Sequence, residues 1–229
     1  MEEELIQYSE RLGERLEKLI LPLVEPGGVD PKDIERSERF RSGCLSLAER
    51  IWEMLDARRD LVDNRILVLE NGTGYLARRL AEGDVDVVSA APTRRLADLA
   101  KRLNPYPSII YRCFNPYPAT DNFDLIIGTG IIACYPKPIA RLLIQSLTSF
   151  CRRKFITELP VQQPWLTKLF QGGITKDSPE ADLELARFGR GEIFELVEHT
   201  CGLLISENRM QQGKMLFKAL RKVHLQPWL

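Results

Sequence analysis

The sequence predicts an α/β fold in which a mostly parallel sheet carries helices on both faces. Short apolar runs alternate with amphipathic segments of helical spacing in the middle of the chain, which is typical of such a sheet. The N-terminal part shows helical spacing only and predicts a helical extension. At the other end, Met210-Gln211-Gln212-Gly213 separates two strand-like runs, which predicts an antiparallel C-terminal hairpin.

The first 62 residues are predicted to form helices. Apolar residues recur every three or four positions from 2 to 24, and Pro26-Gly27-Gly28 ends this helix. Asp30-Pro31 is suited to start a second helix, and a third is expected from about 45 to 61. We therefore divide the chain into a helical extension or lid, 1–62, and an α/β domain, 63–229. Because apolar faces rarely stay exposed, we expect the extension to pack on the domain, or on a second copy in a homodimer.

Seven runs are predicted to be strands. Parallel strands are expected at 65–69, 85–88, 108–111, 123–127 and 154–159, and the antiparallel pair at 203–209 and 214–220. Helices are predicted between them, with a last one at about 191–200 that carries His199 near its end.

Composition excludes several classes of function. Lys plus Arg and Asp plus Glu both total 32, so the basic excess of a nucleic-acid-binding protein is missing. None of the five cysteines forms a Cys-x-x-Cys pair, so neither a metal site nor a disulfide framework is predicted. The acidic start is unlike a targeting peptide, and no apolar run reaches the roughly 20 residues of a membrane span. These features predict a cytoplasmic protein without membrane contact.

A glycine-rich turn follows the first predicted strand. Residues 65–77 read Arg-Ile-Leu-Val-Leu-Glu-Asn-Gly-Thr-Gly-Tyr-Leu-Ala. Glycines between a strand and a helix allow the backbone to approach a ligand closely, and dinucleotides and S-adenosylmethionine (SAM) are both bound in this way. The turn therefore predicts a nucleotide-like cofactor.

The stretch from Asn71 to Ala77 resembles the first motif of class I SAM-dependent methyltransferases, commonly Val-Leu-Asp-x-Gly-Cys-Gly-Thr-Gly. Asn122-Phe123-Asp124 and Phe155-Ile156-Thr157-Glu158 are similar to the family's fourth and fifth strands, and the C-terminal hairpin to its last two. The resemblance implies a Rossmann-like sheet of seven strands in the order 3-2-1-4-5-7-6, SAM as cofactor and methyl transfer as reaction. A helical lid is similar to those of small-molecule methyltransferases, while RNA and protein substrates stay open.

The motif departs from the family pattern at informative positions. Aligned on Gly-Thr-Gly, Val68 replaces the acidic residue and Glu70 the first glycine, while Ser89 replaces the acid that binds the ribose at the end of the second strand. Glu70 either bonds the cofactor directly or fills its place. The cofactor-binding candidates are Glu70, Asn71, Gly72, Thr73, Gly74, Ser89, Phe114, Asn115 and Gly128.

Two residues are candidates for the substrate side. Tyr135 lies just past the fourth strand and Glu158 at the mouth of the fifth, where such enzymes contact substrates or catalyse. The sulfonium of SAM supplies the leaving group, so the protein mainly aligns the nucleophile and excludes water.

Two alternatives remain. The replaced motif residues favour a catalytically silent module that binds a partner. Gly72-x-Gly74-x-x-Ala77 also matches the dinucleotide fingerprint, and Arg94 and Arg95 suit the 2′-phosphate of NADP. However, no tyrosine has Lys four residues later, as the catalytic pair of short-chain dehydrogenases requires.

Overall fold

The computed structural model describes residues 2–24, 31–56, 60–116, 122–161, 186–211 and 213–222. Two compact units are defined by their internal contacts, Met1–Asn115 and Pro116–Leu229. The first unit contains α1 (Glu2–Val24), α2 (Pro31–Trp52), β1 (Arg65–Leu69), α3 (Tyr75–Ala81), β2 (Asp86–Ala91), α4 (Arg94–Leu103) and β3 (Ile109–Cys113). The second contains β4 (Phe123–Gly128), η2 (Ile131–Cys134), α5 (Lys137–Ser149), β5 (Cys151–Pro160), α6 (Arg190–Phe194), η5 (Glu195–Thr200), β6 (Leu203–Gln211) and β7 (Lys214–Arg221).

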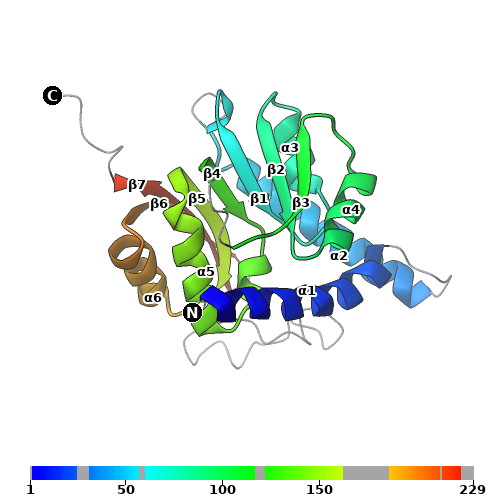
Figure 1. The fold of residues 1–229 in the computed structure, drawn as a ribbon, viewed down its shortest axis with the longest axis horizontal. Coiled ribbons are helices and arrows are strands. Elements are labelled where there is room, and N and C mark those ends of the chain that lie inside the picture. Colours follow the sequence, from blue (N-terminus) through cyan, green and yellow to red (C-terminus); the bar gives the residue numbers. More distant parts are fainter. Residues whose placement is uncertain are drawn as a thin grey trace. The chain divides into compact units, whose positions relative to one another are not determined.

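The strands form a seven-stranded sheet in the order β3-β2-β1-β4-β5-β7-β6 (Figure 1). β1 pairs with β2, β2 with β3 and β4 with β5 in parallel, whereas β7 pairs antiparallel with both β5 and β6. The predicted order, the C-terminal hairpin and the inner position of β1 are all confirmed. The alternation of apolar strands with amphipathic helices was enough for this prediction because each layer must bury its apolar face.

The predicted boundary between a second and a third N-terminal helix is wrong. α2 runs without interruption from Pro31 to Trp52, so one helix replaces the start of the helix expected at 45–61. Its only glycine, Gly43, is exposed, and a single glycine inside a helix costs only about 1 kcal/mol. Ala48 and Ile51, near the end of the same helix, are buried.

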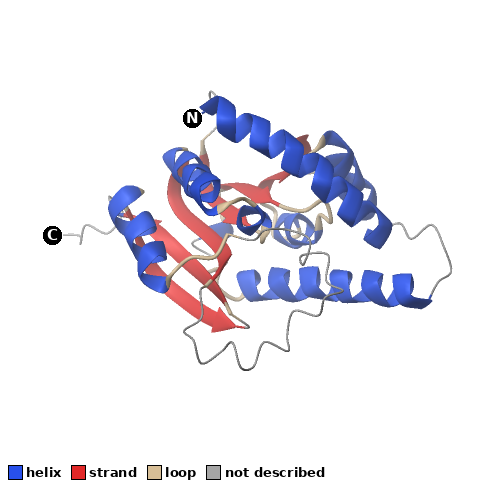
Figure 2. Ribbon diagram, turned by 90° about the horizontal axis from the view of Figure 1, so that it is seen from below, coloured by secondary structure: helices blue, strands red, loops and turns tan. Residues whose placement is uncertain are grey.

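The N-terminal helices belong to the first unit. α1 contacts α2 and α4, and α2 contacts α3. Figure 2 shows α1 and α2 converging where the first ends and the second begins. Their buried faces hold Leu5, Leu12, Leu16, Ile20 and Ile51. Of the two alternatives expected for these apolar faces, the structure shows packing on α3 and α4 of the domain, while a homodimer through these helices stays a prediction.

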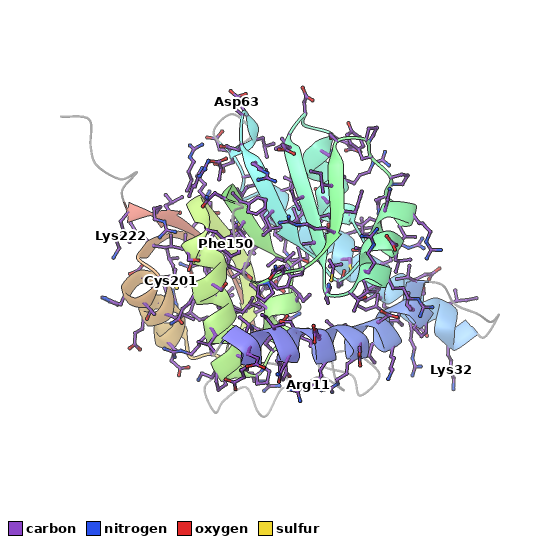
Figure 3. All side chains as sticks on the ribbon, in the orientation of Figure 1. Arg11, Lys32, Asp63, Phe150, Cys201 and Lys222 are labelled. Atoms are coloured by element: carbon purple, nitrogen blue, oxygen red, sulfur yellow. The ribbon has the colours of Figure 1, made fainter. Side chains whose placement is uncertain are left out.

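α1 crosses the carboxyl ends of the strands of this unit. In Figure 3, Asp63 marks the amino end of β1, and Arg11, on α1, lies at the opposite end of the strands. Ligands bind at the carboxyl ends of strands in open α/β sheets. Within the described residues, no helix is long and apolar enough to cross a membrane.

Candidate functional site

The turn after β1 is built on two glycines with left-handed backbone. Gly72 has φ 97° and Gly74 has φ 73°, a region that side chains with a Cβ rarely adopt. A Cβ at Gly72 would also lie 3.0 Å from the Cβ and the carbonyl oxygen of Leu96 on α4. The side-chain amide of Asn104 donates to the carbonyl of Thr73 at 2.7 Å and fixes the turn against the end of α4. Both glycines are thus required by the turn and by its close packing on α4.

Glu70 is the first residue after β1, and its side chain points back into the protein. Only 2% of it is exposed, and its Oε1 accepts a hydrogen bond from the Ser89 hydroxyl at 2.9 Å. Its carboxylate also accepts the backbone N–H groups of Gly74 and Ala77, at the start of α3. Burial raises the pKa of Glu70 from 4.5 to about 7, although these three hydrogen bonds oppose the rise. The carboxylate therefore closes the turn from inside.

This geometry favours a second alignment of the motif. Glu70-Asn71-Gly72-Thr73-Gly74 matches the Asp-x-Gly-Cys-Gly part of the family pattern when the acids are aligned. Val68, which the first alignment placed at the acidic position, is a fully buried residue within β1. In the second alignment the acid is present, and Leu76 in α3 stands in place of the third glycine.

Ser89 does not lie at the end of its strand, because β2 extends to Ala91 rather than stopping at 88. It pairs with Val68 on one side and Tyr111 on the other, and only 2% of it is exposed. The carboxyl end of β2 is formed by Ala90 and Ala91, which carry no hydrogen-bonding side chain. The strand therefore offers neither the predicted serine nor an acid to a ribose.

The end of β3 brings two of the predicted residues next to β2. The Phe114 N–H donates to the carbonyl of Ala91 at 2.7 Å, with Phe114 half-buried and Asn115 exposed. Within β3, the Tyr111 hydroxyl donates to the carbonyl of Asn104. Burial, with a contribution from the Glu70 charge, raises the pKa of Tyr111 to about 12. An aromatic ring and an exposed amide thus stand at the carboxyl edge.

The two N-terminal helices reach this edge at separate points. On α1, Oε2 of Glu17 accepts from the Thr93 hydroxyl at 2.9 Å, and Oε1 lies 3.1 Å from Nη1 of Arg95. On α2, the sulfur of Cys44 accepts from the amide of Asn71 at 3.6 Å. Sequence reasoning missed these contacts, since the apolar stripe of a helix says nothing of the polar groups beside it.

Three predicted residues lie in the second unit. Gly128 ends β4, where a Cβ would lie 2.7 Å from Cδ1 of Ile132. Tyr135 follows η2 and is 1% exposed, so its ring belongs to the core of this unit. Glu158, on β5, is 2% exposed and lies 3.7 Å from Nζ of Lys214 on β7.

The groups gathered at the carboxyl edge of the first unit are those that could contact a ligand. Among them, no group of His, Cys, Asp and Glu side chains has the geometry to hold a metal ion. The first unit offers a glycine turn, backbone and amide groups, an aromatic ring and the carboxylate of Glu17, while the Glu70 carboxylate is bonded inside the turn.

Solved structures share this fold. Magnesium protoporphyrin IX methyltransferase (ChlM) from Synechocystis PCC 6803 with bound S-adenosylhomocysteine (SAH) matches with a TM-score of 0.67 at 17% identity, over 89% of this chain and 93% of its own. A SAM-dependent methyltransferase from Methanosarcina mazei gives 0.56 at 18%, over 75% and 96%. An O-methyltransferase family 2 protein from Planctomyces limnophilus, in complex with apigenin, gives 0.58 at 12%, over 84% and 66%.

At these identities the similarity establishes the fold, which is that of class I SAM-dependent methyltransferases. No protein-family model matches the chain, and no curated protein matches its sequence.

Proposed function

We propose that this protein is a SAM-dependent methyltransferase that acts on a small molecule. The observation that carries the proposal is the turn from Glu70 to Gly74, which follows inner strand β1 in the strand order of the methyltransferase fold. Magnesium protoporphyrin IX methyltransferase, which shares the fold, was solved with SAH and with SAM. In open α/β folds the carboxyl end of such a strand is the place for a nucleotide-like ligand.

The residues present fit the cofactor in most parts. The turn at Gly72 and Gly74 would receive the amino-acid portion, with Asn71 as its half-exposed polar side chain. The Phe114 ring would pack on the adenine and the Asn115 amide would hydrogen-bond its edge. Thr73, Ser89 and Gly128 stay candidates from the sequence, and all three are buried.

When bound, SAM supplies a methyl group activated by its sulfonium. The protein then needs to align the acceptor and exclude water. Tyr135 and Glu158 stay the candidates for the substrate side, although both are buried in this arrangement, with Nζ of Lys214 3.7 Å from Oε2 of Glu158. The extension, 1–62, would serve as the lid, because α1 and α2 already contact the β2–α4 turn and the glycine turn.

One observation favours the second candidate, a silent module that binds a partner. Glu70 and Ser89 are nearly inaccessible and bonded to each other, so neither offers a polar atom to a ligand in this arrangement. An NADP enzyme is less well supported. The dinucleotide-binding order 3-2-1-4-5-6 lacks the antiparallel strand β7, and Arg94 and Arg95 are paired with Asp98 and Glu17.

Ligand-induced stabilisation separates these candidates. At 100 times its dissociation constant, SAM or SAH should stabilise the fold by about 2.7 kcal/mol, measured by thermal unfolding, whereas NADP should have no effect. Gly72→Ala should reduce the shift, and Gly43→Ala, on the exposed face of α2, should preserve it. Methyl label from SAM, incubated with cell extract, should then appear in the small-molecule fraction. No stabilisation at millimolar SAM and SAH would leave the partner-binding module as the better account.

A further inference from the structure

The carboxyl end of β2 carries a carboxylate that comes from another element. Nucleoside sites in doubly wound sheets place an acid at the end of the second strand, where it accepts a hydrogen bond from a ribose hydroxyl. In this chain the strand itself ends in Ala90 and Ala91. The carboxylate beside this strand end belongs to Glu17, which lies on α1 and reaches Thr93.

Glu17 retains the capacity to bind more donors. Its Oε2 accepts from Thr93 and its Oε1 from Arg95, which uses two of the about four acceptor positions of a carboxylate. The ion pair with Arg95 compensates its charge, and 21% of the side chain remains exposed. Two free acceptor positions suit the two adjacent hydroxyls of a ribose.

α1 is held at this place by close backbone contact. A Cβ at Gly13 would lie 2.8 Å from Cγ2 of Thr93 and 3.1 Å from the carbonyl oxygen of Pro92, so the helix approaches the β2–α4 turn as only glycine permits. Glu10 lies about one turn before Gly13 and two turns before Glu17, on the same face of α1. Glu10 is exposed and Glu17 partly exposed, so both carboxylates lie at the border of the buried apolar face of α1.

The same turn is joined to the glycine turn through α4. Thr93 caps α4 by accepting the N–H of Leu96 at 3.2 Å, and Leu96 is the residue against which Gly72 packs. The segment that carries Thr93 and contacts Glu17 therefore adjoins the glycine turn.

We propose that Glu17 is the ribose-binding carboxylate of the cofactor site, supplied by the lid helix α1 in place of an acid on β2. The inference rests on the proposed function, and it adds a direct contact between the lid helix and the ribose of the cofactor. Opening α1 would remove the ribose contact, so cofactor affinity and lid closure are coupled.

The test compares SAH with its 2′-deoxy and 3′-deoxy derivatives by calorimetry. Wild type should bind SAH roughly tenfold or more tightly than the deoxy forms, as expected for a hydrogen bond to a charged group. Glu17→Gln should weaken SAH by a similar factor and bring the ratio between SAH and the deoxy forms close to one. Glu17→Asp, with a shorter reach, should give an intermediate ratio. Glu14→Gln, an exposed change on the same helix, should leave the affinity for SAH and the ratio between SAH and the deoxy forms at the wild-type level.

The ratio, rather than affinity alone, decides the question. If Glu17→Gln weakens all three ligands equally and keeps the ratio, Glu17 only positions α1 and the inference is wrong. Wild type that binds SAH without preferring the ribose form refutes it as well, with the proposed function intact. Wild type that binds no SAH at millimolar concentration overturns both.

Discussion

Glu70→Gln should change how the stability of this protein depends on pH. The buried Glu70 carboxyl has a pKa of about 7 in the folded chain, against the ordinary value of 4.5 that applies to the unfolded chain. Between these values the folded state holds a proton that the unfolded state has released, so stability falls as pH rises through this window. Below pH 4.5 both states are protonated, and above pH 7 the loss is complete.

The magnitude follows from the same pKa. Each pKa unit corresponds to 1.36 kcal/mol, so the rise from 4.5 to about 7 makes wild type about 3 kcal/mol less stable at pH 8 than at pH 4 through this group alone. Little screening by solvent is expected because 2% of the side chain is exposed. Glutamine has nearly the same shape and does not titrate, so the variant should lack this loss.

Urea unfolding followed by circular dichroism, at half-unit steps from pH 4 to 8, measures the effect. All other groups titrate equally in both proteins and cancel in the difference between them. That difference should move by about 3 kcal/mol in favour of Glu70→Gln across the window. Glu82→Gln, an exposed glutamate of the same unit, should run parallel to wild type. Parallel curves for Glu70→Gln and wild type would show that the carboxyl is not buried as described.

Three further outcomes are expected. Gly72→Ala should destabilise the fold by about 1–3 kcal/mol in urea unfolding, because the φ of 97° at Gly72 and its contact with α4 both oppose a Cβ. Gly43→Ala, the control, should be neutral or stabilising by up to about 1 kcal/mol. Removing residues 1–60 should weaken SAH about tenfold in calorimetry, and unchanged affinity of a folded fragment would refute the lid. Affinity for SAM should rise with pH up to about 7, because the positive charge of SAM favours the ionised form of the Glu70 carboxyl. Glu70→Gln should abolish this dependence of SAM affinity on pH.

The fold could be predicted because its signals are local and repeated. β1 was predicted with its observed bounds, since a run of apolar residues ends at a glycine turn. The end of β2 was placed three residues early, because the alanines after Ser89 carry little β-propensity and the strand is extended by pairing with β1 and β3. That small error moved Ser89 from the supposed ligand edge into the interior.

The site could be predicted only in its glycine turn. Nothing in the local sequence of Glu70 shows that its carboxylate bonds Ser89, 19 positions later, because that contact depends on the pairing of β1 with β2. Glu17 is more distant still, 76 positions from Thr93 along the chain. A helix face can be recognised as apolar from its period, but its polar contacts depend on which strand ends it crosses.

Glu70 and Glu17, both in the first unit, are suited to different tasks. Glu70 lies inside, with its pKa raised toward neutrality and its oxygens bonded to the turn, so it stabilises the turn and offers little to a neutral hydroxyl. Glu17 lies at the edge, in an ion pair and partly exposed, so it can accept further hydrogen bonds. A motif that has lost its ribose acid on β2 is therefore not evidence for a silent site by itself. An acid from another element can lie beside the same strand end, as Glu17 of α1 does here.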